Sequence, residues 1–227
     1  MFGDFMKDVV LITGMSSLGK ELALYFKKLK YNVIITYNNN LDLEFINKYN
    51  IKYYHLDIKD DNSVKSLKEE IELNYKEIFL LINNASLSMD DYYMDLNKKD
   101  FMNVLETNIY GTYNMIRTFS NITKNIINIS STDSENTYSK YNLDYSISKS
   151  SINFINKYFT DFDKTTNYYL IIPNWINTES IRNMDQKYLK SELDRVKQSK
   201  LIECEIVCNS CLECLKHKSG YTIRIEG

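Results

Sequence analysis

The chain has 227 residues, with 28 Lys and Arg against 30 Asp and Glu, a formal net charge of −2 and 44% hydrophobic residues. This length suits one well-buried domain and is short for two. The balanced charge, without a long run of either sign, excludes a strongly basic nucleic-acid surface and a polybasic membrane anchor. The apolar runs are far shorter than the ~20 residues of a membrane-spanning helix. We therefore expect a single soluble domain, residues 1–227.

The chain alternates between short apolar runs, rich in β-branched residues, and longer patterns of helical period. The apolar runs are residues 9–12, 33–35, 52–56, 78–82, 126–129 and 169–172. The helical patterns are residues 18–30, 41–49, 63–74, 101–119 and 145–162. Continuous apolar strands separated by helices are typical of a parallel sheet covered on both faces. With right-handed crossovers, the sequence predicts one doubly wound α/β domain of Rossmann type.

The start of the first apolar run bears on localisation. It begins close to Met1, so we expect no targeting segment ahead of it and a cytoplasmic protein.

Residues suited to a dinucleotide follow several of the predicted strands. The first strand runs into Thr13-Gly14-Met15-Ser16-Ser17-Leu18-Gly19-Lys20. The glycines of such a turn let backbone amides approach a pyrophosphate at the positive end of a helix. Asp57 follows the third strand, where it is placed to accept from an adenine amine, and Asn83-Asn84-Ala85 follows the fourth. A lone Asp or Asn at a strand end is more often a helix cap, but their positions after successive strands favour a cofactor site.

One tyrosine is set apart by its spacing to a lysine. Of the 19 tyrosines, only Tyr145 has a lysine four residues later, Lys149. On a helix this spacing puts the phenol and the ammonium on one face, one turn apart. An adjacent cation favours the phenolate and lowers the pKa of a phenol from its usual ~10. The pair predicts a proton donor for carbonyl chemistry, although an ordinary amphipathic helix is the competing interpretation of the pair alone.

In their order along the chain, these motifs resemble those of the short-chain dehydrogenase/reductase family, from residue 9 to residue 227. The residue Asn108, in Thr107-Asn108-Ile109-Tyr110-Gly111, is similar to the family's helix asparagine. Together with Asn108, Ser131, Tyr145 and Lys149 resemble its catalytic tetrad. Residues 173–178 resemble its Pro-Gly segment ending in Thr, and residues 220–227 its closing strand. The resemblance implies a mostly parallel sheet of seven strands.

The chain departs from the family's pattern in the cofactor turn and after the sixth strand. The turn usually reads Thr-Gly-x-x-x-Gly-x-Gly, and here the middle glycine is missing after Ser17. This bears on the geometry of pyrophosphate binding. Asn174 replaces the usual glycine after Pro173, although Asn tolerates a left-handed backbone better than most residues.

The resemblance implies hydride transfer between a nicotinamide and a carbonyl or alcohol carbon. Tyr145 would donate a proton to the developing alkoxide as general acid. Lys149 would lower the pKa of that phenol and hold the nicotinamide ribose. Ser131 would hydrogen-bond the substrate oxygen. Because the interval from Ser131 to Tyr145 is slightly long, Ser130 and Thr132 are alternatives for this hydroxyl.

The resemblance also assigns supporting roles. Asn108 would anchor a water that relays protons to the lysine, and Thr178 would contact the carboxamide and fix the reacting face of the ring. We predict no metal site. The predicted cofactor-binding residues are Gly14, Ser16, Ser17, Leu18, Gly19, Tyr37, Asn38, Asp57, Ile58, Asn84, Ala85, Tyr145, Lys149, Pro173, Ile176 and Thr178.

The end of the second strand, residues 35–39, bears on the choice of cofactor. An acidic residue there would bind the adenosine ribose 2′-hydroxyl and repel a 2′-phosphate. No acidic residue is present, so we predict NADP. NAD is the alternative, because no arginine is there to bind the phosphate.

Residues 178–203 are expected to form a substrate lid, since such segments commonly close over bound substrate. Its apolar residues recur at near-helical spacing, which a helix packed on the body would also show. They are Met184, Tyr188, Leu189, Leu193 and Val196. The compact lid favours a small or extended substrate. The resemblance points equally to 3-oxoacyl carrier-protein reductases and to pteridine reductases, and we rank a 3-oxoacyl thioester or related ketone first.

Two further expectations concern partners and the class of protein. The resemblance implies a homodimer or homotetramer formed through the helices at 101–119 and 145–162, with no nucleic-acid or membrane partner. Because the glycine turn is short, a dinucleotide-binding regulator without catalytic activity is the alternative from a different class.

All four cysteines lie close together, as Cys204, Cys208, Cys211 and Cys214. The first three have the C-x3-C-x2-C spacing of radical-SAM enzymes, and clustered thiolates bind iron-sulfur clusters or zinc. Offsets of 0, 4, 7 and 10 also trace one face of a helix, where reduced cysteine packs as a small apolar residue. We favour the core helix, because the resemblance places this segment before the closing strand. The two histidines lack metal-ligand spacing.

Overall fold

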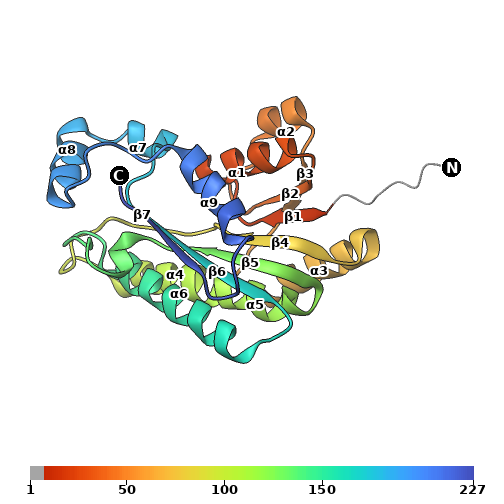
Figure 1. Ribbon diagram of the computed structural model, residues 1–227. Helices are drawn as coiled ribbons and strands as arrows, with labels where there is room; N and C mark the ends of the chain where they lie inside the picture. Colours follow the sequence, from red (N-terminus) through yellow and green to blue (C-terminus); the bar gives the residue numbers. More distant parts are fainter. Residues whose placement is uncertain (1–7) are drawn as a thin grey trace.

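Seven parallel strands form the centre of the protein (Figure 1). The computed structural model describes residues 8–227, and residues 1–7 of the predicted domain lie outside the described residues. The strands are β1 (Val9–Ile12), β2 (Asn32–Tyr37), β3 (Lys52–His55), β4 (Ile78–Asn83), β5 (Thr123–Ile129), β6 (Asn167–Pro173) and β7 (Thr222–Ile225). Their order across the sheet is β3-β2-β1-β4-β5-β6-β7, and all neighbours are parallel. The predicted doubly wound fold is confirmed, with a sheet that is wholly parallel.

Helices cover both faces of this sheet. On one face lie α1 (Ser17–Lys28), α2 (Leu43–Tyr49) and α9 (Cys204–Cys214) (Figure 1). On the other lie α3 (Asp61–Tyr75), α4 (Lys98–Leu105), α5 (Thr112–Phe119) and α6 (Leu143–Phe162). Two short helices, α7 (Glu179–Arg182) and α8 (Gln186–Arg195), follow β6 and stand at the edge of the domain. This three-layer arrangement accounts for the alternation of apolar runs and helical patterns in the sequence.

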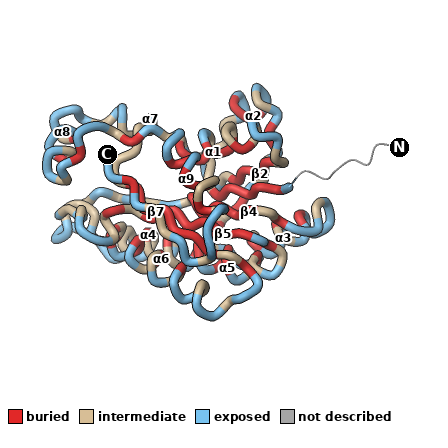
Figure 2. Tube along the Cα trace, in the orientation of Figure 1, coloured by how far each residue is buried: buried red, intermediate tan, exposed pale blue. Residues whose placement is uncertain are grey.

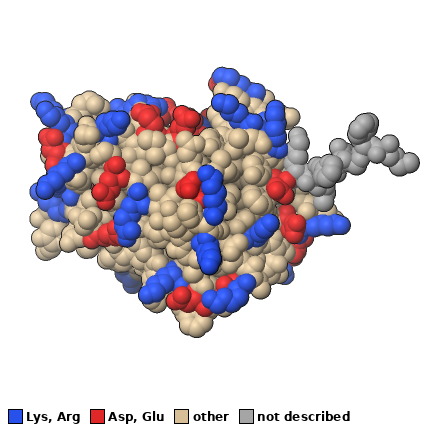
Figure 3. Space-filling view, viewed as in Figure 1, with Lys and Arg blue, Asp and Glu red and all other residues tan. Residues whose placement is uncertain are grey.

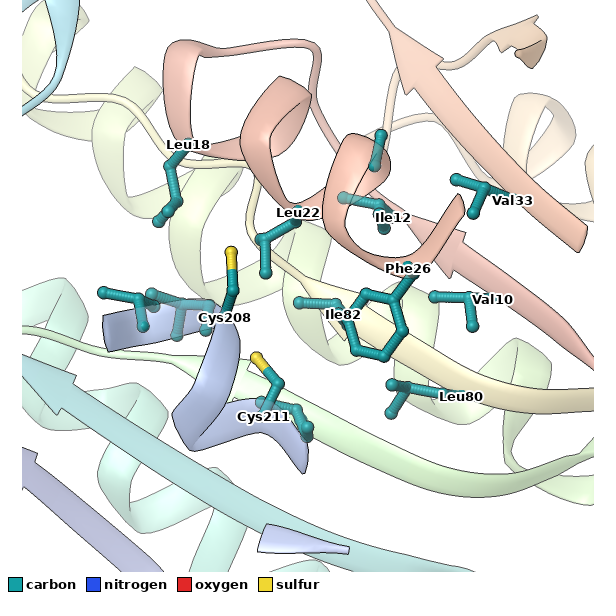
Figure 4. Close-up of a cluster of buried hydrophobic side chains, with 14 of the residues drawn as sticks. Val10, Ile12, Leu18, Leu22, Phe26, Val33, Leu80, Ile82, Cys208 and Cys211 are labelled. Carbon is teal, nitrogen blue, oxygen red and sulfur yellow. The ribbon is translucent and has the colours of Figure 1, made fainter. Parts of the chain in front are cut away.

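The central strands, such as β1 and β4, are buried on both sides, which is why their sequences are almost continuously apolar. Val10 and Ile12 belong to the core cluster shared with α1 and α9 (Figure 4). Val9 and Leu11 belong to the cluster shared with α3 and α5. Successive side chains of a strand point to opposite faces of the sheet, so both sets of side chains are buried away from water. Figure 2 shows the buried strands between helices that are exposed on their outer surfaces.

The cysteine segment forms α9, and three of its four thiols face the core. Cys208, Cys211 and Cys214 are buried and belong to the α1 side of the core, whereas Cys204 is half-buried. Figure 4 shows Cys208 and Cys211 among the apolar side chains of α1 and the sheet. Burial raises the pKa of Cys208 and of Cys214 to about 12 and raises that of Cys211 well above its usual value. Metals bind the thiolate, which burial disfavours here. The predicted core helix is confirmed, and no metal-binding group of His, Cys, Asp or Glu occurs among residues 8–227.

The pattern at residues 101–119, predicted as one helix, is interrupted. A π-helical turn, η1 (Glu106–Gly111), separates α4 from α5. Asn108 lies in this turn, where its Oδ1 accepts from the Leu87 N–H at 2.7 Å. Its Nδ2 donates to the Leu87 carbonyl at 2.8 Å and to Ser148 Oγ at 2.9 Å. The turn therefore links the loop after β4 to α6. The spacing of apolar residues in a helix does not report such tertiary contacts, so the π-helical turn could not be predicted from it.

The charge on the surface and the length of the apolar helices agree with what the composition predicts. On the face shown in Figure 3, acidic and basic side chains are interspersed. Across residues 8–227, the structure contains no helix with both the length and the apolar character needed to cross a membrane.

Candidate active site

A cavity of about 780 Å³ lies at the carboxyl ends of the strands, where parallel α/β folds place ligands. Its wall contains most of the predicted site residues. They are Gly14, Ser16, Ser17, Leu18, Tyr37, Asn38, Asp57, Ile58, Asn84, Ala85, Ser131, Tyr145, Lys149, Pro173, Ile176 and Thr178. Two predicted residues, Gly19 and Asn108, do not line the cavity and instead support segments that do. The fold thus brings the predicted cofactor and proton-transfer residues to one place.

The glycines of the turn after β1 are required by close backbone packing. Gly14 has a positive φ of 83°, and a Cβ there would lie 3.0 Å from the Cα of Ala85. A Cβ on Gly19 would overlap the carbonyl oxygen of Gly14. The absence of side chains at both positions lets the turn pack against the end of β4 and places its backbone beside the first turn of α1. That turn carries no acidic residue, and its N–H groups lack helical acceptors. These features fit a dinucleotide pyrophosphate.

The shortened turn is held by side chains in place of the missing glycine. Ser16 caps α1, and its Oγ accepts from the Gly19 N–H at 3.2 Å. From the neighbouring strand end, Asn84 Nδ2 donates to the Gly14 carbonyl and to Ser16 Oγ, both at 3.2 Å. Asn84 is only 8% exposed, so these hydrogen bonds are shielded from water. Asn84 therefore holds the shortened turn against the end of β4.

The opposite end of the cavity is suited to an adenosine. Residues 36–40 line it without an acidic side chain. Asp57 and Lys59 also line it. The Asp57 Oδ1 accepts from the Lys59 N–H at 3.0 Å, so this carboxylate organises its own loop as well as facing the cavity.

Tyr145 and Lys149 lie together on α6, as the four-residue spacing predicts. Lys149 Nζ is 5.4 Å from the centroid of the Tyr145 ring and donates to the Ile129 carbonyl at 2.9 Å. Burial lowers the pKa of Lys149 to about 8. The pKa of Tyr145 is raised, chiefly by burial and then by the negative charge of Asp133, while a hydrogen bond with Ser131 opposes the shift.

This differs from the expectation that the lysine would lower the pKa of the phenol. Burial disfavours the charged form of each group, and the ammonium of Lys149 is directed at a backbone carbonyl. Near neutral pH, Tyr145 therefore holds its proton.

Among the three neighbouring hydroxyls left open by the sequence, Ser131 is the one that acts to lower the pKa of this phenol. Ser130 is buried and donates to Asn153 Oδ1 at 2.6 Å. Thr132 is buried and accepts from Thr137 Oγ1 at 2.8 Å. The alternatives are thus engaged with other side chains, and Ser131 stays the predicted hydroxyl.

Several cavity-lining residues were not predicted. The most notable are Asp90, Asp133, Tyr141, Trp175 and Glu192. They come from the loops after β4, β5 and β6 and from α8. Trp175 lies within the 173–178 motif but was not singled out, and the other four belong to no periodic pattern or motif in the sequence. The signal that was available for Asp133 is its position two residues after Ser131.

The predicted lid region spans α7 and α8. An isolated parallel bridge between Ile176 and Ile202 closes its base. Met184 and Tyr188 line the cavity, whereas Leu189 is buried beneath them. The apolar stripe therefore serves both packing and the cavity wall, and its movement over a substrate stays a prediction.

The parallel sheet, the glycine turn and the Tyr–Lys pair at one cavity define a Rossmann-type protein with a dinucleotide-binding site. The family model described as "Enoyl-(Acyl carrier protein) reductase" matches residues 12–223. The chain belongs to the short-chain dehydrogenase/reductase family and is an oxidoreductase of that family. This membership implies a nicotinamide dinucleotide cofactor.

Individual relatives share modest identity with the chain. It is 26% identical over 235 residues to a 3-oxoacyl-[acyl-carrier-protein] reductase of Buchnera aphidicola, covering 97% of this chain and 96% of that protein. It is 30% identical over 113 residues to an NADPH-dependent 1-acyldihydroxyacetone phosphate reductase of Schizosaccharomyces pombe, covering 48% of this chain and 38% of that protein. An apo SCOR enzyme from Clostridium thermocellum has a similar fold, with a TM-score of 0.81, 21% identity and coverage of 97% and 91%.

Proposed function

We propose that the protein is an NADPH-dependent carbonyl reductase in which Tyr145 is the general acid. The observation that carries the proposal is the meeting of Tyr145, Ser131 and Lys149 at the wall of the cavity that also contains the glycine turn. When bound, the reduced nicotinamide supplies the hydride.

The protein's own part of the reaction is to orient the carbonyl and deliver a proton. Ser131 and Tyr145 both hydrogen-bond the substrate oxygen, since both side chains line the same cavity and Ser131 acts on the phenol. Tyr145 then transfers its proton to this oxygen as negative charge develops there. Lys149 holds the nicotinamide ribose. Asn108 positions α6 through Ser148, and its relay of protons through a water is part of the proposal.

NADP is the proposed cofactor, and NAD is the alternative. The uncharged residues 36–40 leave the rim after β2 without a carboxylate. A carboxylate at this rim would repel a 2′-phosphate. Asp57 and Ile58 would flank the adenine, and Thr178 the carboxamide.

A 3-oxoacyl thioester or a related ketone is the proposed substrate class, since relatives bear names of this activity. A pteridine is the alternative within the same reaction type. A regulator that binds the dinucleotide without turnover is the alternative of another class, and the Tyr145–Lys149 pair argues against it because binding alone needs no proton donor.

We also propose a cytoplasmic homodimer or homotetramer. Along α6, Phe154 is 67% exposed and Phe162 is 72% exposed, with Tyr158 between them at 51%. Such a row of exposed aromatics favours contact with a second copy. Four free thiols suit a reducing compartment.

Titration with NADPH and with NADH, followed by the fluorescence of the reduced nicotinamide, tests the proposal. Lys149→Ala should weaken NADPH binding, and Tyr145→Phe should retain binding but lose ketone reduction. Tighter binding of NADH would overturn the assignment of NADP. If neither nucleotide binds, the proposal that the protein is an enzyme is overturned.

A further inference from the structure

Three acidic side chains surround the substrate end of the cavity, beside the candidate acid. They are Asp90, Asp133 and Glu192. Among residues 8–227, the only Lys or Arg side chains on the cavity wall are Lys59, at the adenosine end, and Lys149. The part of the cavity that must receive the substrate is therefore acidic.

The three acids differ in how they are neutralised. Glu192 is buried and accepts two hydrogen bonds from the Arg195 guanidinium, at 2.6 and 3.0 Å. Neither Asp90 nor Asp133 takes part in an ion pair within residues 8–227. Arg195 is the cation that acts on Asp133 at longer range, but its guanidinium is already committed to Glu192.

Asp133 is the acid that is fixed nearest to the reacting groups. It lies in the short helix η3 (Thr132–Ser134), where its N–H donates to Ser131 Oγ at 3.2 Å. Its Oδ1 accepts from Thr137 Oγ1 at 2.9 Å, which holds the carboxylate in place. Burial raises the pKa of Asp133, and its charge in turn raises that of Tyr145. This half-buried carboxylate thus acts directly on the site where a carbonyl would lie.

We propose that the cavity selects ketones that carry a positive charge close to the carbonyl, and that Asp133 is the residue that determines this selection. The proposal rests on the proposed carbonyl reductase activity and names its substrate class. A cationic group on the substrate supplies the counter-charge that Asp133 lacks within the protein, whereas an anionic group is repelled by Asp90 and Asp133 together. Cationic ketones are thus reduced in preference to neutral ketones of the same shape.

The test compares two ketones that differ only in charge. They are the N,N-dimethyl-4-oxopiperidinium ion and 4,4-dimethylcyclohexanone, with 4-oxocyclohexanecarboxylate as the anionic probe. The value of kcat/KM is measured with NADPH at pH 7 for the natural protein, for Asp133→Asn and for Glu135→Gln. Glu135 is the matched control, since it lies two residues further on and pairs outside the cavity with Arg224 at 2.8 Å.

We expect the natural protein to prefer the cation over its neutral isostere by at least tenfold and to reduce the anion least. Asp133→Asn should bring this preference below threefold, through a higher KM for the cation, and leave kcat/KM for the neutral ketone within threefold. Glu135→Gln should keep the preference. Melting temperatures measured beside the kinetics separate lost selectivity from lost fold.

The proposal is overturned if the natural protein reduces the neutral ketone as well as the cation, or if Asp133→Asn keeps the full preference. Both results leave the carbonyl reductase in place. If NADPH does not bind and no ketone is reduced, the proposed function fails, and the selection by Asp133 fails with it.

Discussion

Replacing Asn84 by alanine tests whether the hydrogen bonds of this side chain stabilise the turn that lacks the middle glycine. Its Nδ2 lies 3.0 Å from the Thr13 carbonyl, 3.2 Å from the Gly14 carbonyl and 3.2 Å from Ser16 Oγ. The amide has two N–H donors, and each buried hydrogen bond contributes a net ~0.5–1.5 kcal/mol. The unfolding free energy should therefore fall by about 1–3 kcal/mol. For a domain of this size, that loss lowers the melting temperature by roughly 2–12 °C.

The same change should weaken the cofactor site specifically. A free-energy loss of about 1.4 kcal/mol in binding is tenfold in Kd, and the released turn carries the N–H groups expected to bind the pyrophosphate. We expect the Kd for NADPH of Asn84→Ala to rise about tenfold in a fluorescence titration. The matched control is Asn125→Ala, at the amino end of β5, where Asn125 Nδ2 donates to the Phe79 carbonyl at 3.0 Å. This control should lose stability and keep its affinity. Equal Kd values for the two variants would refute the role of Asn84 in holding the cofactor turn.

Four further predictions follow from the packing and the titration of particular side chains. Gly19→Ala should abolish NADPH binding in the same titration, because its Cβ would overlap a backbone carbonyl, whereas Gly220→Ala, remote in the fold, should cost stability alone. Burial lowers the pKa of Lys149 from 10.5 to about 8, so between these values this lysine binds more protons in the unfolded chain, and its contribution to stability rises with pH. The buried cysteines act in the opposite sense over the same interval, but equally in both proteins compared. At ~1.4 kcal/mol per pH unit over this interval of 2.5 units, the unfolding free energy of the natural protein should gain about 3 kcal/mol relative to that of Lys149→Met, measured by chemical denaturation. In native protein a thiol reagent should titrate at most Cys204 quickly and reach the three buried cysteines only after denaturation; four fast thiols would contradict the buried α9. Phe154→Glu should convert the proposed oligomer to monomer in sedimentation velocity without unfolding it, and an unchanged assembly would exclude this face of α6 as the contact.

The sequence was sufficient for the sheet because burial on both faces leaves an unmistakable pattern. A strand such as β4, Ile78–Asn83, is apolar at nearly every position, and few other structures require that. The break in the helix pattern at Glu106–Gly111 was not predictable in this way. It depends on hydrogen bonds between Asn108 and the backbone of Leu87, 21 residues away in the chain, and a local pattern contains no information about that partner.

The candidate site was predictable where the spacing of residues along one helix determines their relative positions. Four residues on a helix determine that Tyr145 and Lys149 share a face, and the structure places them so. Spacing did not distinguish Ser131 from its neighbours, because the choice depends on how the η3 turn directs each side chain. For the same reason Asp133 was missed: it enters the cavity through the conformation of a loop that follows no periodic rule.

Burial and charge together set the resting protonation state of the proposed acid. Burial and Asp133 raise the pKa of Tyr145, while burial lowers that of Lys149. The resting site therefore keeps its proton on the phenol. Giving that proton to a carbonyl oxygen leaves a phenolate, which burial and the charge of Asp133 both disfavour. A cationic group on the substrate, placed beside Asp133 as proposed, offsets that charge and so eases the proton transfer as well as the binding.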